Sequence, residues 1–208
     1  MQKIKSPILK LVLRMAETSM LLALGTVLSL FTVFQAPFGG SITPFSTLPF
    51  VIIGFRFGPK WGVPSMIAGG ALQLLLGLSN YAYASSLLAV VTITLFDYLL
   101  AFSAYGLAGI FRRRSNTSDA HEQGARSTFY MNDFVAIGFG AAFASLLRFV
   151  CHFLSGITVW SGWAPEGTPV WLYSLTYNGG YMIIEMITCV VGAVLIVPTL
   201  RMIDRLYK

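Results

Sequence analysis

Four ionisable side chains of this sequence stand inside long apolar stretches: Asp97, Arg148, His152 and Glu185. Charged groups at membrane depth are costly, and they usually face the interior of a helix bundle or a water-filled cavity. With His152 neutral, two carboxylates and one guanidinium leave one negative charge unmatched. Such a set favours the binding of a small cationic ligand.

The composition indicates a membrane protein. Of the 208 residues, 56% are hydrophobic and 11% are charged, whereas about 25% of residues are charged in an ordinary soluble domain. The net charge of +6 would suggest a nucleic-acid partner in a soluble protein. Here the basic residues separate apolar runs, so membrane topology explains them better. We expect an all-α integral membrane protein that lies in a lipid bilayer and binds no nucleic acid.

The apolar segments predict six transmembrane helices in a single membrane domain, residues 1–208. The predicted spans are about 11–34, 43–57, 61–78, 85–111, 134–160 and 177–200, and residues 112–132 are expected to form a cytoplasmic loop. Pro44 and Pro49 interrupt the second segment. Such interruptions are tolerated where neighbouring helices or a cavity satisfy the freed backbone groups. The second segment is therefore not expected to be a simple lipid-facing helix.

The basic residues predict the orientation. Thirteen of the 14 Lys and Arg fall on one side of the predicted spans, namely Lys3, Lys5, Lys10, Arg14, Arg56, Lys60, Arg112, Arg113, Arg114, Arg126, Arg201, Arg205 and Lys208. The loops on the other side, 35–42, 79–84 and 161–176, contain none. Because Lys and Arg concentrate in cytoplasmic loops, we expect a multi-pass protein of the cell membrane with both termini in the cytoplasm.

The four ionisable groups are predicted to lie at one depth. At about 1.5 Å per helical residue, Asp97 lies about 22 Å from Arg112, and Glu185 lies about 24 Å from the basic residues that end the chain. The same count places Arg148 at this level and His152 one turn further out. The alternative to a ligand site is a structural salt bridge between helices, for example Arg148 with Glu185.

Aromatic residues gather in the predicted outer loops. They are Trp160, Trp163, Trp171, Tyr173 and Tyr177 around one loop, with Tyr81 and Tyr83 from another. Rings at this level can form an interfacial belt. They can also enclose a ligand, because ring faces attract cations and stack on flat heterocycles. Asn178 adds a neutral hydrogen-bonding group near the outer mouth.

Motifs for enzymatic chemistry are missing from the sequence. No stretch matches the phosphate loop G-x-x-x-x-G-K-[ST], the nucleophile elbow G-x-S-x-G or the zinc motif H-E-x-x-H. We therefore expect a binding protein without metal or cofactor, and not an enzyme. Transport of the ligand would need an energy source in another subunit.

Three stretches carry a resemblance to a known family. They are LRFVCHFLSGITVWSGWAPEGTPVWLYSLTYNGGY at 147–181, DYLLAF at 97–102 and GGSITPFSTLPF at 39–50. The first contains the spacing R-x-x-x-H-x(7)-W-x(12)-Y-x(4)-N. The chain closely resembles the thiamine-specific substrate-binding (S) components of energy-coupling factor (ECF) transporters, the ThiT family. The similarity covers most of the chain, apart from the 115–128 loop and both ends.

The resemblance implies a fold and a function. S components have six helices and cytoplasmic termini, and they capture a vitamin with high affinity at the outer face. They then topple in the membrane after docking onto a coupling protein with two ATPase subunits. For this chain the resemblance implies thiamine as the ligand and these subunits as partners. Docking in the family uses small residues on the first helix, and the matching positions are Ala16, Ser19 and Ala23.

The resemblance also implies roles for site residues. His152, Trp160, Tyr173 and Asn178 correspond to thiamine contacts, with Trp160 stacking on a ring. The acidic position, usually Glu in the family, holds Asp97 and is followed by Tyr98.

Three further positions belong to the implied site. Arg148 stands where some members have Lys, and it is expected to order the pocket rather than touch the ligand. Glu185 is assigned to the substrate site because of its charge at membrane depth. In related proteins an aromatic residue of the first outer loop closes over the thiazolium, and Phe38 is the candidate here.

Three other functions stay open on the sequence. A proton-coupled secondary transporter of a small organic cation could use Asp97, Glu185 and His152 as a proton relay. An S component could instead take a pyrimidine precursor of thiamine. An intramembrane hydrolase could be built on His152.

Overall fold

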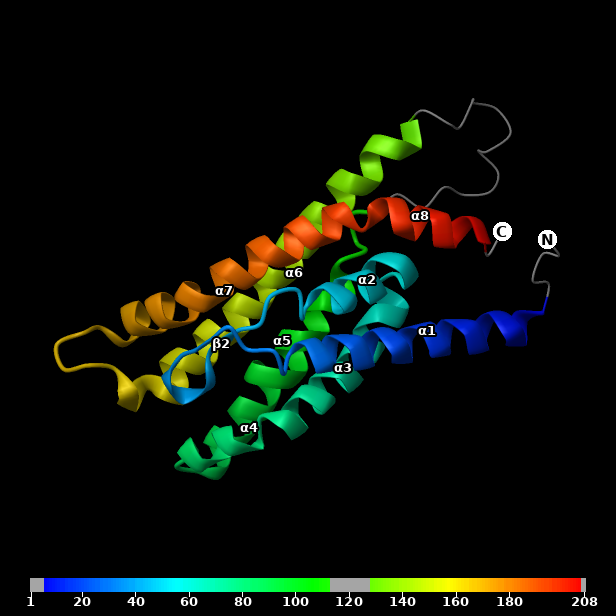
Figure 1. Cartoon of the computed structure of the whole chain (residues 1–208). Helices are drawn as coiled ribbons and strands as arrows, with labels where there is room; N and C mark the ends of the chain where they lie inside the picture. Colours follow the sequence, from blue (N-terminus) through cyan, green and yellow to red (C-terminus); the bar gives the residue numbers. More distant parts are fainter. Residues whose placement is uncertain (1–5, 113–127, 207–208) are drawn as a thin grey trace.

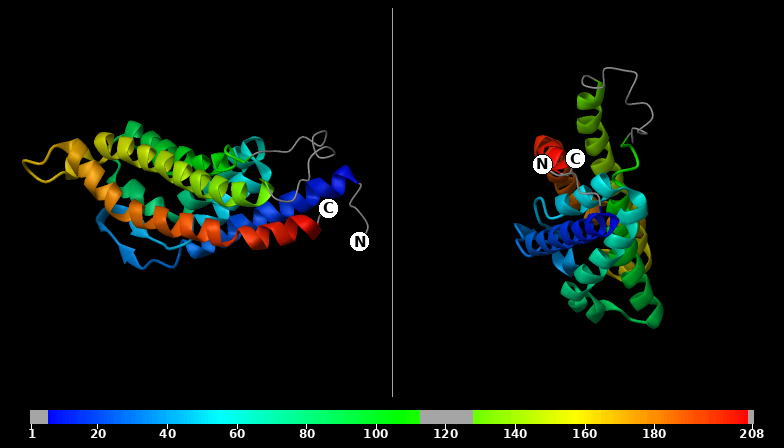
Figure 2. Two further views of the ribbon diagram at one scale, coloured as in Figure 1. Left: turned by 90° about the horizontal axis from the view of Figure 1, so that it is seen from above. Right: turned by 90° about the vertical axis from the view of Figure 1, so that its right-hand side faces the viewer.

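The computed structural model describes residues 6–112 and 128–206, apart from the side chains of residues 38, 128–132 and 205–206. The candidate Phe38 thus lies outside the described side chains. Figures 1 and 2 show an elongated bundle of helices. In chain order the elements are α1 (Pro7–Leu28), β1 (Phe34–Gln35), η1 (Pro37–Gly39), β2 (Ser41–Ile42), α2 (Leu48–Phe57), α3 (Pro59–Leu76), η2 (Leu78–Tyr83), α4 (Leu87–Thr92), η3 (Ile93–Leu99), α5 (Leu100–Ser103), η4 (Ala104–Leu107), α6 (Thr128–Thr158), η6 (Trp160–Trp163), α7 (Val170–Leu195) and α8 (Val197–Leu206).

Within the described residues, four helical stretches are long and apolar enough to cross a membrane. They are Pro7–Leu28, Leu87–Leu107, Asp133–Thr158 and Val170–Leu195, and they overlap four of the predicted spans. The other two predicted spans overlap α2 and α3. The ten residues of α2 give a length of about 15 Å, which is less than the hydrocarbon core of about 30 Å. Helix α2 is therefore too short to cross a bilayer alone.

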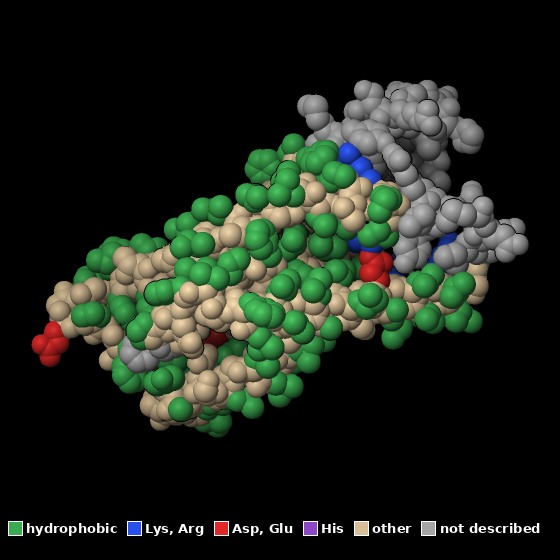
Figure 3. Space-filling model, in the orientation of Figure 1, with side chains coloured by type: hydrophobic (Ala, Val, Ile, Leu, Met, Phe, Trp, Pro, Cys, Tyr) green, Lys and Arg blue, Asp and Glu red, His purple; other side chains and the backbone are tan. Residues whose placement is uncertain are grey.

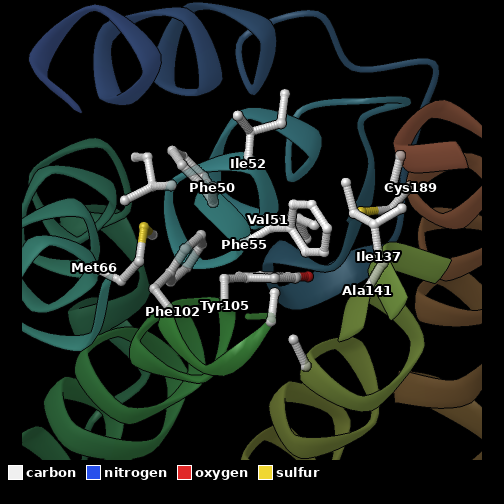
Figure 4. Packing of buried hydrophobic residues seen from close by; sticks show 14 of the residues in the cluster. Phe50, Val51, Ile52, Phe55, Met66, Phe102, Tyr105, Ile137, Ala141 and Cys189 are labelled. Atoms are coloured by element: carbon white, nitrogen blue, oxygen red, sulfur yellow. The ribbon is translucent and has the colours of Figure 1, made fainter. Parts of the chain in front are cut away.

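Helix α2 lies at the centre of the bundle. Every residue from Pro49 to Phe55 is buried, as a helix that is apolar on all sides requires. Figure 4 shows its side chains between Met66 of α3, Phe102, Tyr105 and the α6 residue Ile137. The Phe50 ring meets Phe102 edge-on, with 5.8 Å between centroids. The prediction that this segment is not a simple lipid-facing helix is confirmed.

A short strand pair departs from the expected all-α architecture. Phe34 of β1 pairs with Ile42 of β2 in antiparallel register. Between the strands, Pro37 has no backbone N–H for a helix, and Gly39 has φ +97°, a value that favours glycine. Helix α1 ends at Leu28, before the strand pair, and α2 starts only at Leu48. The predicted helical ends at 34 and 43 were therefore wrong.

A π-helix interrupts the fourth predicted span. Residues Ile93–Leu99 form η3 between α4 and α5, and this segment carries Asp97 and Tyr98. Both side chains are buried, at 8% and 7% exposure, although neighbours on an α-helix point about 100° apart. Turns of π-helix occur frequently at functional sites. Here the turn brings two consecutive side chains into the bundle.

The last two long helices differ from the predicted spans at their ends. Helix α6 starts at Thr128, within the predicted 112–132 loop, while residues 113–127 lie outside the description. Helix α7 starts at Val170 rather than 177. Helix α7 ends at Leu195, and α8 begins at Val197 as a separate helix.

An ion-pair group connects helices at the end of the bundle that holds both termini (Figures 1 and 3). Arg56, at the end of α2, binds Glu17 of α1 and Asp204 of α8, the latter at 2.9 Å. Arg112 reaches the other oxygen of Asp204 at 3.2 Å. These contacts fasten α1 and α8 to the central helix at this end.

Candidate functional site

A cavity of about 360 Å³ lies in the half of the bundle away from the termini. Its volume is in the range of small-molecule sites, roughly 300–1,000 Å³. Figure 3 shows a hollow in this region with an acidic side chain deep inside. The lining includes all eight side chains predicted to form the substrate site: Asp97, Tyr98, Arg148, His152, Trp160, Tyr173, Asn178 and Glu185. Four separate segments, η3, α6, η6 and α7, thus deliver the predicted residues to one cavity.

Arg148 and Glu185 form a buried salt bridge across α6 and α7. The Arg148 Nη1 atom lies 2.8 Å from Glu185 Oε2, and its guanidinium stands 5.0 Å from the centroid of the Phe102 ring. The other carboxylate oxygen, Oε1, accepts from the Thr43 hydroxyl at 2.7 Å and from the Thr43 N–H at 3.1 Å. Both oxygens of Glu185 therefore have protein partners. The salt bridge that the sequence left open as an alternative is therefore present.

Asp97 has a different environment. Its Oδ2 atom accepts from the Ser155 hydroxyl at 2.9 Å and from the Trp160 indole N–H at 3.3 Å. Its Oδ1 atom lies 3.3 Å from His152 Nδ1. Among the described residues no Lys or Arg is paired with Asp97, whereas Glu185 has Arg148.

The geometry divides the four charges into two sets. Arg148 and Glu185 neutralise each other, so with His152 neutral the negative charge of the cavity is that of Asp97. The buried Nε2 atom of His152 has no hydrogen-bond partner among the described residues. A buried polar atom without a partner is unfavourable. The arrangement offers a ligand one carboxylate charge and one nearby imidazole nitrogen.

Asn178 connects α7 to α6. Its amide nitrogen donates to the Ser174 carbonyl at 3.0 Å and to the His152 carbonyl at 3.3 Å. Its carbonyl oxygen accepts from the Tyr181 hydroxyl at 3.0 Å. The amide therefore also positions the backbone of His152, a role that the sequence did not indicate.

The Tyr98 hydroxyl is bonded to residues that follow α3. Its hydroxyl accepts from the Asn80 amide at 2.8 Å and donates to the Gly77 carbonyl at 3.1 Å. The ring thereby links η3 to the end of α3. Because both hydroxyl functions have protein partners, the group that Tyr98 presents to the cavity is chiefly its ring.

Two aromatic clusters include residues that line the cavity. The Tyr83 ring lies 5.5 Å from Trp160 and 5.6 Å from Trp163, measured between centroids. In the second cluster, Tyr173 and Tyr177 are 5.8 Å apart between centroids, with an interplanar angle of 34°. Centroid separations of 4.5–7 Å are typical of interacting rings. Trp160 and Tyr173 line the cavity, so these rings take part in the site rather than forming only a belt.

The strand-pair loop is fastened to α7 beside the cavity. The Tyr177 hydroxyl accepts from the Gly40 N–H at 3.1 Å and donates to the Pro37 carbonyl. Gly39 and Gly40 line the cavity. A Cβ atom on Gly40 would approach the Tyr181 ring to 2.8 Å, so glycine permits this close contact.

The residues predicted for partner docking lie elsewhere. Ala16, Ser19 and Ala23 are all exposed on α1. Only 11% of the most apolar part of α1 is buried inside the bundle. The corresponding share is 33–39% in the other three long helical stretches of the described chain. The exposed face of α1 is therefore free of contacts with the rest of the bundle.

Several residues in or beside the cavity were missed on the sequence. Ser155 and Thr43 bind the two carboxylates, and Gln73 of α3 lines the cavity. Hydroxyl residues are common in membrane helices and gave no distinct signal. Gln73 did give one, because an amide inside an apolar span is as exceptional as the charges considered above.

These features define a class: an all-helical membrane protein with a ligand-sized cavity lined by aromatic rings and one uncompensated carboxylate. The sequence profile of the thiamine transporter protein family (Thia_YuaJ) matches residues 15–204. The chain therefore belongs to the thiamine transporter family, the ThiT family of ECF S components, and it is a transporter subunit and not an enzyme.

Relatives and a solved structure agree with this assignment. The thiamine transporter ThiT of Bacillus subtilis (strain 168) is 31% identical over 192 residues, which cover 91% of this chain and 93% of the relative. ThiT of Lacticaseibacillus paracasei is 27% identical, with 73% and 71% covered. A structure of ThiT from Listeria monocytogenes superposes with a TM-score of 0.70 at 19% identity, covering 91% of this chain and 96% of that one. The fold is that of ThiT.

Proposed function

We propose that the cavity binds thiamine, with the Asp97 carboxylate facing the thiazolium cation. The observation that carries this proposal is the contrast between the two acids. Glu185 is paired with Arg148, while Asp97 has only neutral donors and the imidazole of His152. Thiamine is a monocation with two flat rings, an amino group and a hydroxyl group. It matches a site with one spare negative charge and stacking rings.

The remaining site residues have distinct proposed roles. Trp160 and Tyr173 stack on the rings of the ligand, and His152 Nε2 receives a donor such as the amino group. Arg148, Glu185 and Asn178 hold the elements that carry these groups. Tyr98 contributes its ring from the other wall.

We also propose the orientation and the partners. The cavity opens to the outside of the cell, and the end with both termini faces the cytoplasm, because nearly all Lys and Arg lie on that side. An ECF coupling protein docks on the exposed face of α1 at Ala16, Ser19 and Ala23, where small side chains permit close helix approach. Two ATPase subunits supply the energy.

The test is a titration of the purified chain with thiamine, followed by quenching of tryptophan fluorescence. Saturable quenching with one site per chain is expected. Replacement Asp97→Asn should weaken binding by more than tenfold, which is about 1.4 kcal/mol. Glu166→Gln is the matched control, because Glu166 is an exposed acid of the outer loop. The absence of quenching, or equal affinity in the Asp97 variant, would contradict the proposal.

A further inference from the structure

The cavity contains a second polar group, formed by Gln73 and Ser29, in addition to the four ionisable residues. Gln73 of α3 lines the cavity and is 8% exposed. Ser29, which caps α1, also lines it, and its Oγ atom lies 3.3 Å from Gln73 Oε1. The Nε2 atom of Gln73 is buried without a hydrogen-bond partner among the described residues. Such a group is unfavourable unless a ligand or a water molecule completes it.

One polar atom of the Gln73 amide lacks a partner among the described residues in either orientation of the amide group. Ser29 has a single hydroxyl proton, which the Thr26 carbonyl at 2.7 Å and Gln73 Oε1 at 3.3 Å share as acceptors. One polar atom of the Gln73 amide faces Ser29, and the other has no protein partner. The two amide atoms are interchanged by a simple flip. A ligand hydroxyl fits in either case, because it can both donate and accept.

The surroundings of Gln73 favour a neutral ligand group. Leu30, just after the end of α1, and Leu76, at the end of α3, also line the cavity and are uncharged. Arg148 is the sole Lys or Arg among the described lining residues, and its guanidinium is paired with Glu185. Figure 1 shows α1 and α3 on the side of the bundle opposite α6 and α7. A charged end group would therefore find no counter-charge beside Gln73.

We propose that Gln73, held by Ser29, binds the terminal hydroxyl group of the ligand and selects for it. This inference rests on the proposed binding of thiamine and names the part of the site that receives its hydroxyethyl arm. With the cation at Asp97 on η3, the aminopyrimidine ring extends towards α6 and α7. The hydroxyethyl arm extends the other way, towards α1 and α3.

The test compares thiamine with an analogue whose hydroxyethyl group is replaced by ethyl. Both ligands are titrated against the purified wild-type chain, Gln73→Met and Ser65→Ala. Methionine keeps the length of the side chain and removes both polar atoms. Ser65 is the control, because it lies on the same helix, donates to the Trp61 carbonyl at 2.8 Å and is not among the lining residues.

We expect the wild type and Ser65→Ala to bind thiamine about tenfold more tightly than the ethyl analogue, and Gln73→Met to bind both ligands within a factor of about two. An unchanged preference for thiamine in Gln73→Met would overturn the inference and leave thiamine binding intact. A wild type that binds neither ligand would overturn the proposed function as well. If Gln73→Met does not fold, Ser29→Ala provides the same comparison, and it should reduce the preference for thiamine; a full preference there would equally overturn the inference.

Discussion

The indole nitrogen of Trp160 donates a hydrogen bond to Asp97 Oδ2 across 3.3 Å. Ser155 donates to the same oxygen, so the direction of the carboxylate and the tilt of the ring are set together. A flat cation that approaches this carboxylate also meets the aromatic ring. Charge attraction and stacking are thus combined at one point of the cavity.

Trp160 contributes both a ring face and an N–H group, and substitutions can separate them. Trp160→Ala should weaken thiamine binding by more than tenfold, or about 1.4 kcal/mol. Trp160→Phe keeps a ring and loses the bond to Asp97, so its affinity should lie between the alanine variant and the wild type. Calorimetric titration measures both. Trp163→Phe is the control, because Trp163 lies outside the cavity lining and is 45% exposed. Wild-type affinity in Trp160→Ala would refute the stacking role.

Arg148 and Glu185 are expected to support the fold. Removing one partner leaves the other charged and buried, which costs about 3–5 kcal/mol. Glu185→Gln and Arg148→Met should each lower the melting temperature in detergent without any ligand. The double variant should be more stable than the sum of the two changes predicts. Additive losses in this double-mutant cycle would show that the pair contributes no coupling.

Tyr177 fastens the strand-pair loop, because its hydroxyl bonds both Gly40 and Pro37. Tyr177→Phe removes these bonds and keeps the ring. We expect faster dissociation of thiamine, by about threefold to tenfold, measured by stopped-flow fluorescence. Thr176→Ala is a neighbouring control, since its hydroxyl binds only carbonyls of its own helix. An unchanged rate in Tyr177→Phe would show that these bonds do not retain the ligand.

The α1 face should matter for uptake and not for binding. Ala16→Trp or Ala23→Trp places a large ring where close helix contact is proposed. Uptake into vesicles that contain the whole ECF complex should fall severely, while the purified variants keep the affinity for thiamine. Leu24→Trp is the control, because Leu24 is exposed on a neighbouring face of α1.

Uptake by the chain alone that a protonophore abolishes would instead support a proton-coupled transporter.

The sequence predicted which residues line the cavity better than it predicted the ends of the helices. Polar residues are so unfavourable in lipid that Asp97, Arg148, His152 and Glu185 could be assigned to one interior layer, and the cavity contains all of them. Their pairing was open, because four groups at one depth can combine in several ways. The rotation of each helix about its own axis determines which of these groups come into contact.

The strand pair and the π-helix were not foreseen for a related reason. Apolar residues predict burial and not backbone geometry, so Phe34 was assigned to a helix although it forms a strand. The turn at Ile93–Leu99 has no Gly or Pro that would mark it. Gln73 was overlooked because an amide carries no charge, yet its depth in an apolar span was a usable signal.

The central claim is that Asp97 recognises the positive charge of thiamine. The most direct measurement compares thiamine with a neutral analogue of the same shape, in which carbon replaces the thiazolium nitrogen, in the wild type and in Asp97→Asn. We predict that the wild type binds the cation more than tenfold more tightly than the neutral analogue, and that Asp97→Asn loses most of this preference. An Asp97→Asn variant that keeps the full preference for the cation would contradict the account.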